Sequence, residues 1–120
     1  MNGANKSDRH CQPELMLENV GDDRDIFLQL AEIFQRESVK IFGEMKAAAS
    51  ALDFEQLGRQ SHSLKGTVGP LGADKLVEML IQIEEECNRN QRVCDENAIA
   101  KIDNELAHVQ MELQQFVDNF

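Results

Sequence analysis

Apolar residues recur at the spacing of an α-helix along most of the chain, and no segment shows the long polar–apolar alternation of a half-buried strand. The longest such pattern starts after Asp22 and Asp23, either of which can cap a helix, and continues to Leu52. At about 100° per residue, one face of this segment carries the apolar side chains Ile26, Phe27, Leu30, Phe34, Ile41, Met45, Ala48 and Leu52. The pattern predicts one long amphipathic helix.

A second long helix is predicted directly after the first. Asp53 and Gln56 stand three residues apart, which is the pattern of a capping box. The helix that they begin extends to about Gly69, because Pro70 lacks a backbone N–H and clashes with the preceding turn. A break is expected at residues 71–72.

Three more helices are predicted, over residues 13–19, 74–88 and 96–117, with a polar loop over 88–95. Four long amphipathic helices joined by short loops favour an all-α fold, an antiparallel up-down-up-down four-helix bundle. The short N-terminal extra helix then acts as a lid. We expect a single domain over residues 12–120 and a flexible polar tail over residues 1–11.

Charge narrows the classes of partner. The 120 residues include 12 Lys and Arg against 22 Asp and Glu, a net charge of −10. Nucleic acids and anionic membrane surfaces attract basic proteins, so neither is an expected partner. Trp and Tyr are absent, which also disfavours a base-stacking platform. The composition indicates a soluble acidic domain whose partners are proteins.

The chain shows no targeting or membrane signal. Its first ten residues lack the apolar core of a signal peptide, and no apolar run approaches the ~18 residues of a membrane span. The cysteines Cys11, Cys87 and Cys94 are odd in number and form no CxxC pair. We expect a cytoplasmic protein with ordinary reduced thiols, and Met1 with its polar tail favours one that stands alone.

His62 lies on the polar face of the second long helix. On a wheel at about 100° per residue, Leu57, Leu64, Val68 and Leu71 lie opposite to it. The wheel therefore predicts that the imidazole points to solvent while the apolar side chains point to the core.

The surroundings of His62 are small or cationic. The residues within about 60° of it on the wheel, or at the edge of that sector, are Gly58, Lys65, Gly66, Gly69 and Arg59. A glycine inside a helix costs about 1 kcal/mol relative to alanine, and Gly58 and Gly66 flank His62 at i−4 and i+4. Leaving both positions bare indicates that a large partner must reach the ring. Lys65 supplies a charge that a phosphoryl oxygen could use.

These features predict an exposed nucleophilic or anion-binding histidine, because an exposed imidazole is largely neutral near pH 7. The alternative interpretation is an incidental surface histidine.

The motif His62-x-Leu64-Lys65-Gly66, followed by Leu71-Gly72-Ala73 and Leu76, resembles the signature of histidine-containing phosphotransfer (HPt) domains. These are the four-helix-bundle phosphocarriers of multistep two-component signalling. The resemblance extends over about residues 14–118, and Pro70 departs from the usual pattern by shortening the helix. It implies that His62 accepts a phosphoryl group, that Lys65 holds the phosphoryl oxygens, and that Gly66 clears the approach of the partner.

The resemblance suggests roles for some neighbours. Thr67 occupies the small or hydroxylated position after the glycine. Glu84 lies where the next helix passes near His62, and it is either the acceptor of a hydrogen bond from the Nδ1–H or an ordinary solvated glutamate. Phe42 is either a docking contact across from His62 or a core residue. The other residues expected around the approaching partner are Gly58, Gly69 and Arg59.

The resemblance also implies a reaction and its partners. His62 attacks the phosphorylated aspartate of a receiver domain in line, and the transfer runs reversibly to another receiver. The expected partners are the receiver domains of hybrid sensor kinases and response regulators, and the chain is expected to be a monomer. Mg²⁺ belongs to the receiver, so this chain needs no cofactor. It has no Gly-rich nucleotide loop, so no kinase activity of its own is expected.

Other interpretations are weaker. Glu105-x-x-His108 has the spacing of di-iron bundles, but those sites need a second such motif and further inward glutamates, so no metal is expected. His10 falls in the predicted tail and carries no signal. A helical adaptor or dimerisation module that performs no chemistry remains the main alternative, since fold does not imply function. A Ser or Cys hydrolase is disfavoured, because no base lies at a suitable spacing.

Overall fold

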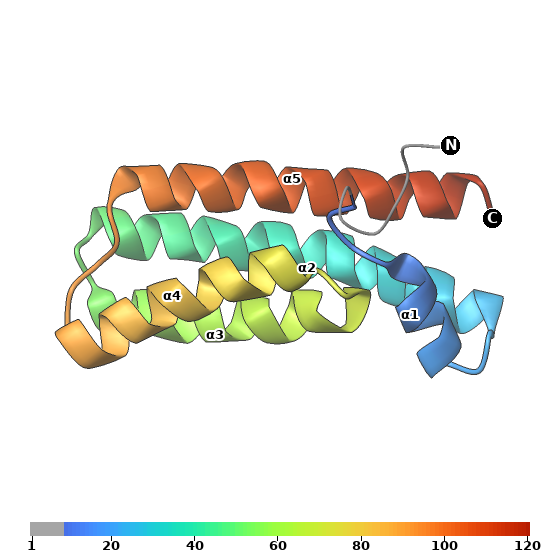
Figure 1. Ribbon diagram of the computed structural model, residues 1–120, viewed down its shortest axis with the longest axis horizontal. Coiled ribbons are helices and arrows are strands. Elements are labelled where there is room, and N and C mark those ends of the chain that lie inside the picture. Colours follow the sequence, from blue (N-terminus) through green and yellow to red (C-terminus); the bar gives the residue numbers. More distant parts are fainter. Residues whose placement is uncertain (1–8) are drawn as a thin grey trace.

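The computed structural model describes residues 9–120, and their regular structure is helical throughout. The elements are α1 (Pro13–Asn19), α2 (Arg24–Ser50), α3 (Phe54–Val68), the 3₁₀ turn η2 (Gly69–Leu71), α4 (Asp74–Asn90) and α5 (Glu96–Asp118). Figure 1 shows the four long helices side by side, with α5 along α2, with α3 beside α4, and with the short α1 across one end. The predicted all-α bundle with a short extra helix is confirmed.

Three long helices begin with the same device. Asp23, Asp53 and Asp95 each accept a hydrogen bond from the backbone N–H three residues further along, at 3.0, 3.1 and 2.8 Å. An aspartate at this position satisfies an N–H that the helix itself leaves unpaired. The choice left open between Asp22 and Asp23 is thereby settled in favour of Asp23.

The break between α3 and α4 is a short 3₁₀ turn around Pro70. Gly72 ends it with a φ of +66°, and a Cβ at this position would lie 2.8 Å from Cδ1 of Leu15 in α1. Glycine adopts this left-handed backbone without strain and leaves room for the Leu15 side chain. The break predicted from Pro70 and Gly72 is confirmed, and α1 covers it.

The loop between α4 and α5 is shorter than predicted. α4 continues to Asn90 and ends where Gln91 adopts a left-handed conformation with φ 52°. The polar residues that suggested a loop are compatible with a helix, and the Asn90 amide donates to Glu86 one turn earlier. Arg92 then bonds the same carboxylate at 3.1 Å.

The core lies between the apolar faces of the four long helices. The residues predicted to lie opposite His62, namely Leu57, Leu64, Val68 and Leu71, are all fully buried. On α2 the predicted apolar face is buried or half-buried except at Ile26, which is exposed. The helix ends at Ser50, two residues before the predicted end at Leu52, and Leu52 is exposed with a left-handed backbone at φ 57°. No helix in residues 9–120 is long and apolar enough to cross a membrane.

The chain packs against the bundle nearer to its N-terminus than predicted. Residues 1–8 of the predicted tail lie outside the described residues, whereas Cys11 is buried at 1% exposure. The backbone N–H groups of His10 and Cys11 both donate to Glu112 of α5, at 2.9 and 3.0 Å. The sequence gave no sign of this, because the partners of these residues lie about 100 positions away on α5.

Candidate functional site

His62 lies in the middle of α3 with its ring directed outward. The side chain is 68% exposed, while the opposite face of the helix is buried. The orientation predicted from the helical wheel is confirmed, and the ring is accessible to another macromolecule.

Glu84 of α4 links His62 to Lys65. Its Oε2 lies 2.9 Å from Nδ1 of His62, and its Oε1 lies 2.8 Å from Nζ of Lys65. The glutamate side chain is 18% exposed and the lysine side chain 28%. The structure therefore brings together three of the residues expected at the site, and Glu84 is not an ordinary solvated glutamate.

The charge of Glu84 determines which nitrogen of His62 carries a proton. Burial raises the pKa of Glu84, but hydrogen bonds from Lys65 and His62 outweigh burial and hold this pKa below its ordinary value. The carboxylate is ionised at neutral pH and can only accept, so Nδ1 must carry the proton. In the neutral ring Nε2 then keeps its lone pair, and this is the nitrogen available as a nucleophile.

The glycines around His62 fall into two groups. Gly66 and Gly69 are exposed, and a Cβ at either position would have no neighbour within 4 Å. The surface on this side of His62 is open, as expected. Gly58 is instead buried against α4, where a Cβ would lie 3.2 Å from both Cβ of Cys87 and Oδ1 of Asn88. The prediction that Gly58 clears the way for a partner is wrong, because this glycine faces the neighbouring helix.

Two other expected partner contacts lie elsewhere. Phe42 is 5% exposed, so it belongs to the core and is not a docking contact. Thr67 donates its hydroxyl to the backbone carbonyl of Ser63 and lines a groove with residues of α1 and α2, away from His62. Arg59 is exposed on α3 and donates to Gln56, six residues before His62.

Within residues 9–120 no group of three or more His, Cys, Asp or Glu side chains is placed to hold a metal ion. Glu105 is 3% exposed, and its Oε2 lies 2.7 Å from Nδ1 of His10. The ring of His108 stacks on that of His10 at 4.3 Å and 9°. The contact of His10 with Glu105 was not predicted from the sequence, because 95 residues separate the two and no motif joins them.

The cysteines are poorly suited to nucleophilic chemistry. Burial raises the pKa of Cys11 to about 12 and that of Cys87 to about 11. Burial also raises the pKa of Cys94. The thiolate is the reactive form, so these side chains remain thiols near neutral pH.

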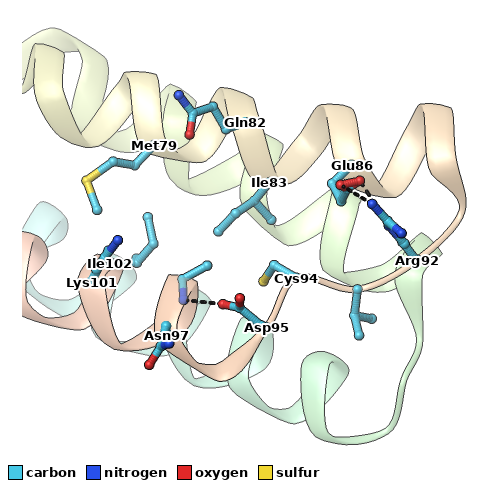
Figure 2. A pocket seen from close by; sticks show the side chains of 12 residues that line it. Met79, Gln82, Ile83, Glu86, Arg92, Cys94, Asp95, Asn97, Lys101 and Ile102 are labelled. Atoms are coloured by element: carbon cyan, nitrogen blue, oxygen red, sulfur yellow. Dashed lines mark hydrogen bonds and ion pairs between the residues drawn. The ribbon is translucent and has the colours of Figure 1, made fainter.

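A groove of about 610 Å³ lies between α4 and α5, as Figure 2 shows. Met79 and Ile83 of α4 point into it opposite Ile102 of α5, and the ion pair of Glu86 and Arg92 lies at one end. At about 100° per residue, Ile83 and Met79 lie roughly 100° and 140° around α4 from Glu84. The groove is therefore separate from the His62 site.

The protein is thus a helical bundle that exposes a histidine bonded to a carboxylate. A family model for the Hpt domain matches residues 29–116, a range that includes His62, Lys65 and Glu84, and the chain belongs to this family. Its general role is therefore that of a phosphocarrier in two-component phosphorelays, in which Hpt domains interact with receiver domains.

Two solved structures have the same fold. Histidine-containing phosphotransfer protein B from Pseudomonas aeruginosa PAO1 is 23% identical, with a TM-score of 0.80, over 92% of this chain and 96% of that chain. The HPT domain of a sensor hybrid histidine kinase from Shewanella is 18% identical, with a TM-score of 0.77, over the same shares. A comparison with curated protein sequences gives no match.

Proposed function

We propose that His62 accepts a phosphoryl group from the aspartyl phosphate of one receiver domain and passes it to the aspartate of a second. The single observation that carries this proposal is the 2.9 Å contact of Nδ1 with Glu84 on a ring that is 68% exposed. This contact keeps the proton on Nδ1 and leaves the Nε2 lone pair facing solvent. The receivers would belong to a hybrid sensor kinase and to a response regulator.

The transfer needs few groups of this chain. The Nε2 lone pair forms a bond to phosphorus, and the bond between phosphorus and the aspartyl oxygen breaks, so the aspartate leaves as a carboxylate. The Nδ1 proton stays in place, and Glu84 balances the positive charge that develops on the ring. Mg²⁺ would be held by the receiver, and this chain would need no cofactor of its own.

Lys65 has two possible anionic partners in this reaction. In the structure its ammonium binds Glu84 at 2.8 Å. An incoming phosphoryl group on Nε2 brings three anionic oxygens to the same side of the helix, one turn from Lys65. We propose that Lys65 then also stabilises these oxygens, as a charge-assisted donor.

The test is transfer of label from a purified receiver that carries radioactive phosphate on its aspartate. Wild type is expected to take up label that is stable in base and labile in acid, as a phosphohistidine is. His62→Gln is expected to take up none, and His108→Gln serves as the matched control. Equal labelling of His62→Gln, or no labelling of wild type by any receiver of the source organism, would overturn the proposal. Binding of receivers without transfer would instead support an adaptor.

A further inference from the structure

Gly58 is the buried glycine of α3, and its place in the helix interior needs a reason. Glycine weakens a helix relative to alanine, and Gly58 does not face the partner side of His62. A Cβ at this position would lie 3.2 Å from Cβ of Cys87 and 3.2 Å from Oδ1 of Asn88. The absence of a side chain therefore allows α3 and α4 to approach closely at this point.

The close approach directly adjoins the His62 site. Gly58 and His62 are four residues apart on α3, and Asn88 and Glu84 are four residues apart on α4. The two helices pack along each other, and they run in opposite directions, as the chain path in Figure 1 shows. The contact of Gly58 with α4 thus lies one helical turn from the contact of His62 with Glu84.

A side chain at position 58 would have to be accommodated by a movement of the helices. Asn88 is exposed and its amide can swing aside. Cys87 is 1% exposed, and its Cβ moves only with the backbone of α4. An alanine at 58 would therefore push α4 away from α3 by a few tenths of an ångström.

Glu84 would be affected by such a movement, because both of its oxygens are used. One binds His62 at 2.9 Å and the other binds Lys65 at 2.8 Å. Hydrogen bonds of this kind weaken beyond about 3.2 Å. We propose that Gly58 is a positioning residue, which sets the separation of α3 and α4 at which Glu84 holds the Nδ1 proton of His62. This inference rests on the proposed role of His62, but its test does not.

The test measures the imidazole of His62 by ¹⁵N NMR in the isolated protein, without any receiver. Gly58→Ala is compared with Gly66→Ala, which places the same methyl four residues from His62 on the other side, where it meets nothing within 4 Å. Wild type and Gly66→Ala are expected to keep the proton on Nδ1 at pH 8. Gly58→Ala is expected to shift a measurable share of the ring to the Nε2–H tautomer and to raise the titration midpoint of the Glu84 carboxyl.

A double variant shows whether the distance between the helices is the cause. Gly58→Ala with Cys87→Gly moves the Cβ from one helix to the facing position on the other. It is expected to restore the Nδ1–H signal, and it keeps the test decisive if Gly58→Ala alone does not fold. The proposal is overturned if Gly58→Ala folds with the tautomer and the Glu84 titration of Gly66→Ala, or if the folded double variant keeps the Nε2–H form.

The phosphotransfer rate separates this proposal from the proposed function. If wild type transfers phosphate, Gly58→Ala is expected to transfer it several-fold more slowly, still on His62, while Gly43→Ala on exposed α2 surface transfers at the wild-type rate. A tautomer shift in a protein that transfers no phosphate would support the positioning role and overturn only the proposed function.

Discussion

Two histidines in residues 9–120 contact a glutamate through Nδ1. At both sites the same groups meet, namely an imidazole, a carboxylate and a lysine. His62 lies 2.9 Å from Glu84, and His10 lies 2.7 Å from Glu105. A lysine approaches each carboxylate, at 2.8 Å for Glu84 and at 3.6 Å for Glu105. The contact of an imidazole with a carboxylate is therefore not what distinguishes the proposed phosphoacceptor.

The two regions differ in the access that they give to the ring. The His62 side chain is 68% exposed, whereas that of His10 is 26% exposed and has the ring of His108 stacked on it. The backbone N–H of His10 is also bound by Glu112. His10 thus anchors the N-terminal segment to α5, whereas His62 leaves one nitrogen free for a partner. The comparison indicates that the exposure of the ring makes the difference.

The largest expected effect separates the two histidines directly. His62→Gln is expected to abolish label uptake from a phosphorylated receiver, because within residues 9–120 no other exposed imidazole has Nδ1 bonded to a carboxylate. His10→Gln is expected to leave uptake at the wild-type level. Both are checked in the same transfer assay, with far-UV circular dichroism to confirm the fold. Loss of uptake in His10→Gln with an intact fold would contradict the comparison.

Removal of the lysine at each site is expected to give the next largest difference in transfer rate. Lys65→Ala is expected to slow transfer by about 100-fold, which is the size of effect seen when one charged or hydrogen-bonding group is removed from a reacting anion. Lys75→Ala is the matched control, since Lys75 is 71% exposed and lies 3.6 Å from Glu105. Its transfer rate, measured by rapid quench under single-turnover conditions, is expected to equal that of wild type.

Removal of Glu84 at the His62 site and removal of Glu112 beside His10 are expected to have different effects. Glu84→Ala is expected to slow transfer by about tenfold, as the loss of an orienting partner of a histidine does, and to change stability little. Glu112→Ala removes the acceptor of two backbone N–H groups and is expected to lower the free energy of unfolding by about 1–3 kcal/mol. Transfer by Glu112→Ala is expected to stay normal. Urea unfolding and the transfer assay together check both, and a transfer defect in Glu112→Ala would show that the N-terminal segment acts on the site.

The parts of the fold that could be predicted are those set by local sequence. The caps at Asp23 and Asp53, the break at Pro70 and the outward direction of His62 depend on residues within a few positions of one another. Each is determined by one helix and its ends, so periodicity and capping chemistry suffice. Glu84 was reachable only through the family resemblance, because it lies 22 residues from His62 in the sequence.

The parts that were missed depend on how the helices meet. A wheel drawn for α3 places Gly58 beside His62, but it does not show that α4 covers this side of the helix. Phe42 stood at the edge of the apolar face of α2, and packing placed it in the core. The contact of His10 with Glu105 joins opposite ends of the chain. In each case the position of the side chain depends on how the helices pack together. The pattern of a single helix does not contain this information.

The smallest expected effect is a dependence of stability on pH that belongs to the His62 region. The pKa of Glu84 is lower in the folded protein than its ordinary value of 4.5, so its contacts stabilise the fold above that value. This contribution is lost as the pH falls from 4.5 through the lower pKa of the folded state. The pH-dependent part of the difference in free energy of unfolding between wild type and Glu84→Gln should therefore shrink as the pH falls below about 4.5. Urea titrations from pH 7 to pH 3 measure it, and Glu85→Gln, an exposed neighbour on the same helix, is the control. A difference that grows as the pH falls below about 4.5 would mean that the Glu84 carboxyl is held protonated in the fold, and the assignment of the proton to Nδ1 of His62 would then be wrong.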